Sequence, residues 1–248
     1  MSAIITPFKG TELFNTASFN NRISQINTGF SYVSNPNLLD NWYFGNAVNQ
    51  RGQTEHIGTQ DGYFVDRWRL GAYNQTVTVT DNGLHWSTTT GIWCTQIIEN
   101  FDKLIGKTLT LSAIIDGVLY SVTGVLNESG DMSMQPVGNM FVELTHDEKC
   151  FRFVTYNGPT PTVTILAAKL ELGPTQTLAH REGNKWVLNE VPDYGEQLRR
   201  CQRHFQTFAT ESLRPTNALD FRPVMRATPA LSTITVGGKT LYTASADL

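Results

Sequence analysis

The sequence TVTVTDNGLHWST, residues 76–88, carries the clearest indication of the fold. Thr and Val alternate over 76–80, which is the period-2 pattern of a half-buried β-strand. Asn82-Gly83 follows, and this dipeptide between two strand-like runs is typical of a two-residue hairpin turn, because both residues tolerate positive φ angles. The returning run at 83–88 completes the pattern, so an antiparallel β-hairpin is expected here.

Comparable runs extend in both directions from this hairpin and are separated by turn residues. Further strands are expected at 63–70, 92–98, 108–116, 119–126, 138–145, 150–156 and 162–172, with a short helical turn at 100–104. No helical segment of crossover length separates these runs, which argues against a parallel βαβ sheet. Residues 37–175 are therefore expected to form a mainly β domain, a jelly-roll β-sandwich.

Residues 1–36 are expected to form an N-terminal helical arm. Its apolar residues are spaced 4-3-4, which places them on one stripe of a helix: Phe19, Ile23, Ile26 and Phe30. Two heptads are too short for a coiled coil that is stable alone. The stripe is therefore expected to pack either on the chain's own body or as an anchor and oligomer interface against other copies and a larger assembly.

Residues 176–248 are expected to form a connector, a helix and a small module of short strands. Asp193 and Glu196 have the spacing of a capping box, and apolar residues then recur on one helical face up to Phe205. Strand-like runs follow at 205–210, 218–224, 231–236 and 240–243. So small a module is marginal alone and is expected to lean on the sandwich or on neighbouring chains.

Composition narrows the class of function. The formal net charge is -3, and charged residues make up only 17% of the chain, so the clustered Lys and Arg of nucleic-acid binding are missing. No apolar run is long enough for membrane insertion. Residues 1–7 lack the features of a signal peptide, so synthesis in a cytoplasm is expected. Cys94, Cys150 and Cys201 have no metal or disulfide spacing and are expected to be buried, reduced thiols.

The sequence contains no recognisable reaction centre. Its histidines occur in none of the usual metal-binding spacings, so no metal and no cofactor are expected. No Gly-x-Ser-x-Gly motif occurs, and the acidic residues that might act in pairs are scattered over different strands and turns. The chain is therefore expected not to be an enzyme, and no catalytic residue is assigned.

Aromatic residues are the candidate ligand contacts. Trp and Tyr rings stack on the apolar faces of sugars, but they also fill sandwich cores. Trp68 shares a strand face with Leu70 under period 2 and is expected in the core. Trp86 and Trp93 flank a Thr-rich loop and fit either role. The candidate ligand-binding residues are Trp86, Trp93, Trp42 and Tyr43.

Several stretches of the chain form a specific combination in a specific order. The first is NLLDNWYF at 37–44, continuing through 46–52 and then DRW at 66–68; the second is AKLELG at 168–173, followed by YGEQLRRCQRHF at 194–205. PVMRATP at 223–229 is similar to a stretch that often follows. Together these residues resemble a phage or prophage tail-fibre or receptor-binding protein with a carbohydrate-binding-like jelly roll. The resemblance implies a homotrimer in the virion that contacts host cell-surface glycans, with its arm on other virion proteins.

Three alternatives to a receptor-binding subunit stay open. A head-fibre or capsid decoration protein would have the same fold and no glycan site. A carbohydrate-binding module of a secreted enzyme would be a monomer with an export signal. A depolymerase would need a pair of carboxylates that folding brings together.

Overall fold

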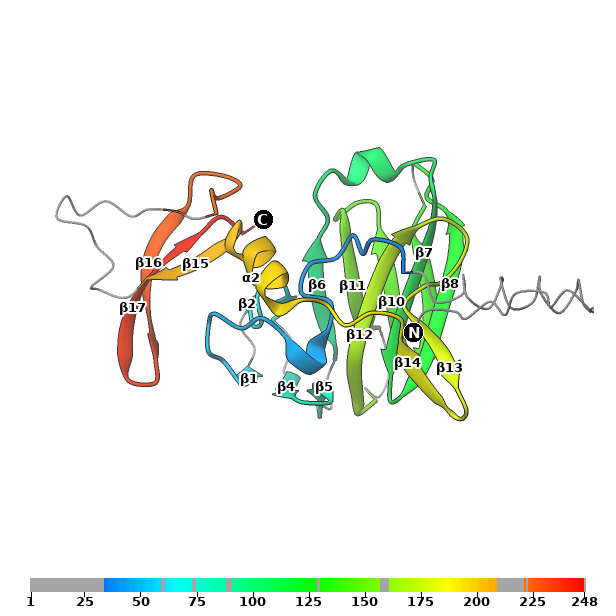
Figure 1. Ribbon diagram of the computed structural model, residues 1–248, viewed down its shortest axis with the longest axis horizontal. Coiled ribbons are helices and arrows are strands. Elements are labelled where there is room, and N and C mark those ends of the chain that lie inside the picture. The colour runs from blue at the N-terminus through cyan, green and yellow to red at the C-terminus, as the bar shows by residue number, and fades with distance from the viewer. Residues whose placement is uncertain are drawn as a thin grey trace, which may run out of the picture.

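The computed structural model describes residues 34–58, 61–72, 75–87, 91–128, 130–156, 161–208, 221 and 223–247. Within these ranges the protein is mainly β, and two six-stranded antiparallel sheets form its body (Figure 1). The expected helical stripe of the arm (Phe19, Ile23, Ile26 and Phe30) lies outside the described residues. None of the helices in the described ranges is long and apolar enough to cross a membrane.

The first sheet, called sheet 1, contains the hairpin that the sequence predicts. Its strand order is β1 (Glu55–Gly58), β4 (Gln75–Thr80), β5 (Gly83–Trp86), β12 (Val163–Leu172), β7 (Thr108–Ile115) and β8 (Val118–Val125). Strands β4 and β5 pair from Thr80 opposite Gly83. Gly83 has a φ of 121°, and a Cβ atom there would overlap the carbonyl oxygen of Ile165 in β12. Glycine is therefore needed both for the turn and for the close approach of β5 to β12.

The second sheet, called sheet 2, departs from the expected strands at one edge. Its order is β2 (Gly62–Tyr63), β3 (Arg69–Leu70), β6 (Trp93–Ile97), β11 (Cys150–Thr155), β10 (Met140–Thr145) and β9 (Met132–Val137). The single strand expected at 63–70 is wrong, because the chain turns back between β2 and β3. Arg67 has a φ of 72° in this turn, and the amide of Phe64 donates to the carbonyl of Trp68 over 3.0 Å.

One hydrophobic core lies between the two sheets, which is the arrangement of a β-sandwich. Its centre is Trp68, whose ring lies 5.1 Å from that of Phe44 and 5.8 Å from that of Phe153. Trp42 and Trp86 belong to the same core, with 2% and no exposure respectively. The indole N–H of Trp86 donates to the side-chain oxygen of Gln75 over 3.2 Å.

Asn41 connects three segments at one end of this core. Its backbone has a φ of 51°, and its side chain is buried. The side-chain amide donates to the carbonyls of Val48 and Asp66 over 2.9 and 2.7 Å, and its oxygen accepts from the amide of Val48 over 2.7 Å. The backbone carbonyl accepts from the indole N–H of Trp68 over 2.9 Å, and the backbone amide donates to the Gln197 side chain over 2.8 Å.

The region expected as a connector contains a further hairpin, β13 (Ala179–Glu182) and β14 (Lys185–Leu188). Leu178, Trp186 and Leu188 pack it against the sandwich core. Two short 3-10 helices, η1 (Phe44–Asn46) and η2 (Phe101–Leu104), complete the body, and η2 confirms the helical turn expected near 100–104. The three cysteines are buried and form no disulfide, also as expected.

The C-terminal module begins with α2 (Tyr194–Gln202), where the expected cap is present: the Asp193 carboxylate accepts from the amide of Glu196 over 2.8 Å. A three-stranded sheet follows in the order β15 (Phe205–Phe208), β17 (Lys239–Ser245) and β16 (Ala230–Val236). The strand expected at 218–224 is absent from its described residues, Phe221, Pro223 and Val224. The module lies at one end of the sandwich (Figure 1).

Replacing the core ring in Trp86→Ala is expected to lower the free energy of unfolding by about 3–5 kcal/mol, because a fully buried indole leaves a cavity. Urea unfolding followed by circular dichroism measures the change. Trp86→Phe is the control: it keeps most of the packing, loses the bond to Gln75, and should cost clearly less. A loss below about 1 kcal/mol for Trp86→Ala would contradict the core position of this ring.

Candidate functional site

The outer face of sheet 2 presents the side chains that alternate with its core residues. Phe151 and Phe153 of β11 point inward, since both of their rings lie near Trp68. Successive side chains in a strand point to opposite faces, so Cys150, Arg152 and Val154 point outward. The register of the sheet then fixes which residues of the other strands lie beside them.

A polar row crosses this face from strand to strand. Arg69 in β3 is opposite Thr95 in β6, and Thr95 is opposite Arg152 in β11. Arg152 is opposite Glu143 in β10, and Glu143 is opposite Ser133 in β9. Five strands thus contribute one polar side chain each to a continuous line.

An apolar row runs beside the polar one. Trp93 in β6 is opposite Val154 in β11, and Val154 is opposite Phe141 in β10. The ring of Tyr156 lies edge-on to that of Phe141, with 5.4 Å between the ring centroids. The outer face is therefore amphipathic along the strands, with a hydrophobic line next to a line of hydrogen-bonding groups.

A hollow of about 640 Å³ lies at the Trp93 end of these rows. Its lining residues are Asp61, Arg69, Gly71, Ala72, Trp93, Thr95, Ile97, Glu148 and Cys150. A Cβ atom on Gly71 would come within 2.9 Å of the Trp93 ring, so the indole lies directly over this glycine. The volume is in the range of small-ligand sites, and the mixture of one aromatic with a few polar groups is typical of them.

The polar row is held in place before any ligand arrives. The Arg152 guanidinium donates to Glu143 over 2.8 Å, to Glu148 over 3.1 Å and to the Tyr156 hydroxyl over 2.6 Å. The Tyr156 hydroxyl in turn donates to Glu143 over 2.7 Å. Burial, and then the hydrogen bond to Glu143, raise the pKa of Tyr156, so its hydroxyl stays a proton donor near neutral pH.

The charged groups at the mouth of the hollow remain accessible. Arg69 pairs with Asp61, and about half of each side chain is exposed. Glu148 is similarly exposed while it contacts Arg152. These groups can exchange their water contacts for hydroxyl groups of a ligand, and hydrogen bonds to charged partners are the stronger ones.

Only one of the four aromatic residues predicted as ligand contacts lies in this hollow. Trp93 lines it. The prediction is not supported for Trp42 and Trp86, because both rings are enclosed by the core. Tyr43 packs against the core and forms a β-bridge to Ala167 in sheet 1.

Sequence reasoning missed the polar partners of Trp93. The alternation Phe151, Arg152, Phe153 could have revealed Arg152 as an outward residue, since the two flanking rings belong inside. Its neighbours across the sheet could not be found in this way, because strand register is a property of the folded chain. Among the described residues, no group of three or more His, Cys, Asp or Glu side chains is placed to hold a metal ion.

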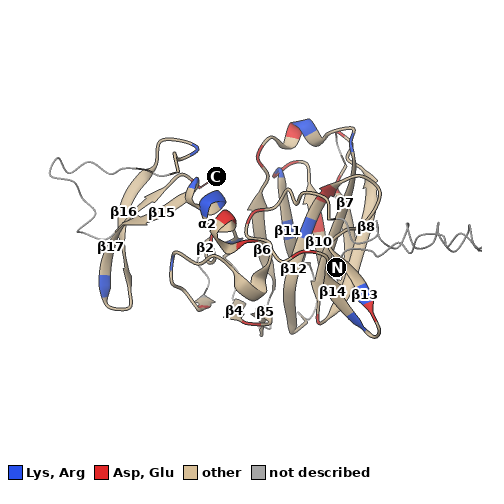
Figure 2. Cartoon of the chain, viewed as in Figure 1, with Lys and Arg blue, Asp and Glu red and all other residues tan. Residues whose placement is uncertain are grey.

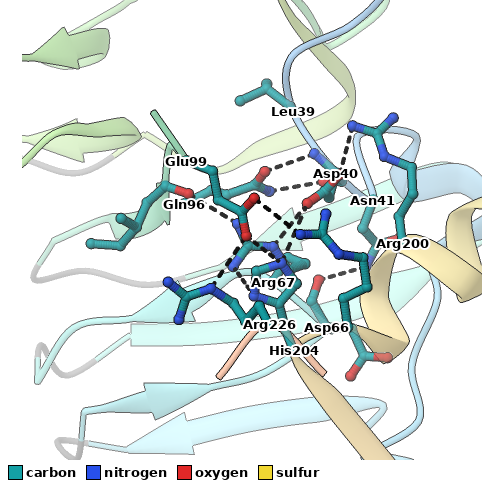
Figure 3. Close-up of polar contacts among 12 residues, drawn as sticks. Leu39, Asp40, Asn41, Asp66, Arg67, Gln96, Glu99, Arg200, His204 and Arg226 are labelled. Carbon is teal, nitrogen blue, oxygen red and sulfur yellow. Dashed lines mark hydrogen bonds and ion pairs between the residues drawn. The ribbon is translucent and has the colours of Figure 1, made fainter. Parts of the chain in front are cut away.

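A second polar cluster lies where the C-terminal module meets the sandwich (Figure 3). Arg67 donates to Asp40 over 3.0 Å and to the carbonyl of Ile97 over 3.0 Å. Its third contact is Nδ1 of His204, 3.1 Å away. An arginine can only donate, so this nitrogen accepts and Nε2 carries the proton, 3.3 Å from Glu99. Burial, followed by the charges of Arg67, Arg226 and Arg203, lowers the pKa of His204 to about 2.

A buried carboxylate completes this junction. Asp66 is fully buried and accepts from the amide and side chain of Gln50, over 3.2 and 2.9 Å. Arg51 lies 3.7 Å from Asp66 and 2.6 Å from Asp247, and its guanidinium covers the Phe205 ring at 3.7 Å. Burial raises the pKa of Asp66 to about 6, against the opposing influence of Gln50 and Arg51. Arg67, His204 and Asp66 are the almost fully buried members of the junction, and their burial between the two modules favours a structural role.

The junction makes a prediction about pH. Because the pKa of Asp66 rises from 3.8 to about 6 on folding, its ionisation weakens the folded state as the pH rises through this window. Asp66→Asn removes that contribution. The unfolding free energy of the variant minus that of the wild type should therefore grow between pH 4 and pH 6.5, by up to about 3 kcal/mol.

Urea unfolding at a series of pH values measures this difference, in which the contributions of other groups cancel. Asp81→Asn, at an exposed carboxylate in the turn between β4 and β5, is the control and should give a much smaller difference. A flat or falling difference for Asp66→Asn would show that burial does not dominate the ionisation of Asp66.

The outer face of sheet 2 is the candidate binding site because of its own geometry. It combines a half-buried indole that lines a hollow, a fixed line of hydrogen-bonding groups and a hollow volume large enough for a small ligand. Comparison of the chain with protein-family models, curated proteins and solved structures gave no match.

Proposed function

We propose that the protein is a phage virion structural protein, a tail-fibre or receptor-binding subunit that attaches to host cell-surface glycans through the outer face of sheet 2. The observation that carries this proposal is the pair of parallel rows, one apolar through Trp93 and one polar through Arg69 and Arg152. No reaction chemistry is needed for such a role.

The two rows match the two kinds of surface on a sugar. A pyranose ring has an apolar C–H face, which can stack on a flat indole such as that of Trp93. Its hydroxyl groups lie around the rim and need donors and acceptors, which Arg69, Asp61 and Glu148 offer at the mouth of the hollow. Because Arg152 already holds Glu143 and Tyr156 in place, little side-chain freedom is lost on binding.

We further propose that the sandwich is of the jelly-roll type. In support, β5 pairs with β12 in sheet 1 while β6 pairs with β11 in sheet 2, so successive strands nest inside one another in alternating sheets. The sequence resemblance to tail proteins over residues 37–229 supports the same assignment. In this proposal Phe19, Ile23, Ile26 and Phe30 of the arm contact other virion proteins.

A homotrimer is the proposed assembly, since three weak sugar sites on one particle gain avidity without new contacts. Large apolar side chains that remain exposed on the C-terminal module, Val224 and Leu231, are consistent with contacts between copies. Light scattering coupled to size exclusion at micromolar concentration should give the mass of three chains. A single-chain mass under those conditions would contradict the assembly.

The glycan site is tested on an array of bacterial surface polysaccharides. The wild-type protein should bind a subset of them, and Trp93→Ala should weaken that binding by about 10-fold or more, because the stacking platform is lost. Tyr242→Ala removes a partly exposed ring from β17, outside the hollow, and should bind like the wild type.

Three other outcomes of the array experiment would each favour a different conclusion. Silence of the wild-type protein would overturn the glycan proposal and favour a head-fibre or decoration protein. Release of reducing ends from a bound polysaccharide would favour a depolymerase. Equal binding by Trp93→Ala and the wild type would remove the outer face of sheet 2 as the site.

A further inference from the structure

The hollow at Trp93 does not end at the edge of sheet 2. Ile97, at the far end of β6, lines this hollow and also a second one of about 410 Å³. Trp93 and Ile97 are four residues apart in one strand, which corresponds to about 13 Å. The two hollows therefore adjoin along β6, with Ile97 as their shared wall, and together they are called the groove. Its length exceeds that of a single sugar ring.

The second hollow is built by both modules. Asp102 and Lys149 come from the sandwich, while Arg203 follows α2 and Arg226 precedes β16 in the C-terminal module. Contacts across the junction hold Arg226 in place: it donates to Glu99 over 3.2 Å and to the carbonyl of Ala246 over 3.0 Å. Charged residues of both signs meet at α2 (Figure 2).

Among the described residues that line the second hollow, cationic side chains outnumber carboxylates. Glu99 alone serves both Arg203, at 3.4 Å, and Arg226, at 3.2 Å. Lys149 pairs with Asp102 over 2.9 Å, and both of these side chains are about half exposed or more. The described lining of the second hollow thus carries one positive charge in excess, whereas the first hollow is lined by Arg69 together with the two carboxylates Asp61 and Glu148.

The same imbalance continues in the adjoining wall. Asp40 alone pairs with Arg67, at 3.0 Å, and with Arg200, at 2.6 Å. Figure 3 displays Arg67, Arg200 and Arg226 around the two carboxylates Asp40 and Glu99. Burial, and then the charges of three arginines, lower the pKa of His204. This indicates a positive electrostatic potential at the junction, although the net charge of the chain is -3.

We propose that this groove binds an acidic polysaccharide, with one sugar stacked on Trp93 and an anionic substituent of a neighbouring unit bound by Lys149 and Arg203. The inference rests on the proposed glycan-binding function and adds the charge class of the ligand. Lys149 and Arg203 are the contact residues because both have side chains about half exposed to the groove. Carboxylate, sulfate and phosphate groups share the required chemistry, since each accepts hydrogen bonds with a negative charge.

The test uses the full-length protein and an array of acidic bacterial capsular polysaccharides. Each is printed in three forms: native, carboxyl-reduced, and chemically stripped of sulfate and phosphate. The double variant Lys149→Ala/Arg203→Ala should bind the native form at least about 10-fold more weakly than the wild type does. Both residues are exposed, so the fold should be unaffected, and equal thermal unfolding midpoints confirm that.

Arg199→Ala is the matched control. Arg199 lies on α2, is more exposed than Arg203, and pairs with Glu196 outside the groove lining. Arg199→Ala removes one positive charge from the helix that precedes Arg203 and should leave binding unchanged. The wild-type protein should bind one of the two neutralised forms about as weakly as the double variant binds the native form, and that form identifies the anionic group.

The possible failures are distinguishable. If Trp93→Ala weakens binding while the double variant binds like the wild type, the acidic-ligand inference is overturned and the glycan-binding function stands. If the wild-type protein binds all three forms equally, the acidic-ligand inference is likewise overturned and the glycan-binding function stands. If neither Trp93→Ala nor the double variant changes binding, the groove is not the site, and the proposed function of this face falls together with the inference.

Discussion

Burial of the Asn41 side chain is the constraint on which the rest of the molecule depends. A buried amide must satisfy both its donors and its acceptor, and here these groups can reach only Val48 and Asp66. The left-handed backbone at Asn41 also aims its carbonyl at the Trp68 indole and its amide at Gln197 of α2. The central core ring and the C-terminal helix are therefore positioned by one residue, and the polar junction forms around it.

The polar junction also fixes the position of β6, the strand that carries the candidate site. Arg67 sits in the turn before Trp68 and binds the carbonyl of Ile97, the last residue of β6. It binds His204 with another donor, so the end of β6 is tied to the C-terminal module. Trp93 begins the same strand. The aromatic end of the groove and its cationic end are thus two ends of one rigid element, which explains how distant parts of the sequence contribute to one surface.

The sequence predicts most of the sandwich where a strand has its own local signal. The alternation at 76–80 and the Asn82-Gly83 turn required no knowledge of the rest of the chain, and they are confirmed. The expectation at 63–70 failed because Arg67 adopts positive φ to reach Asp40, a tertiary contact that overrides the alternating pattern. Strand β9 was missed because Pro136 breaks a short alternation of Met and polar residues, and pairing with β10 makes the segment a strand.

The candidate site could be predicted only in part. Trp93 was identified, but nothing local separates it from Trp86, which points into the core from β5 of the opposite sheet. The polar row depends on register across five strands, and register is fixed by long-range pairing that a single sequence does not display.

The polar junction also limits how this chain can recombine with others. Buried ion pairs contribute modestly to stability, but removal of one partner leaves an uncompensated charge and is strongly unfavourable. A crossover in the stretch between β12 and α2 would separate Arg51 from Asp247 and Arg67 from His204. A chimeric protein that receives a different C-terminal module should therefore fold well only if the sandwich residues that contact this module are exchanged as well. The two modules should therefore be exchanged together, although they look separable in the ribbon diagram (Figure 1).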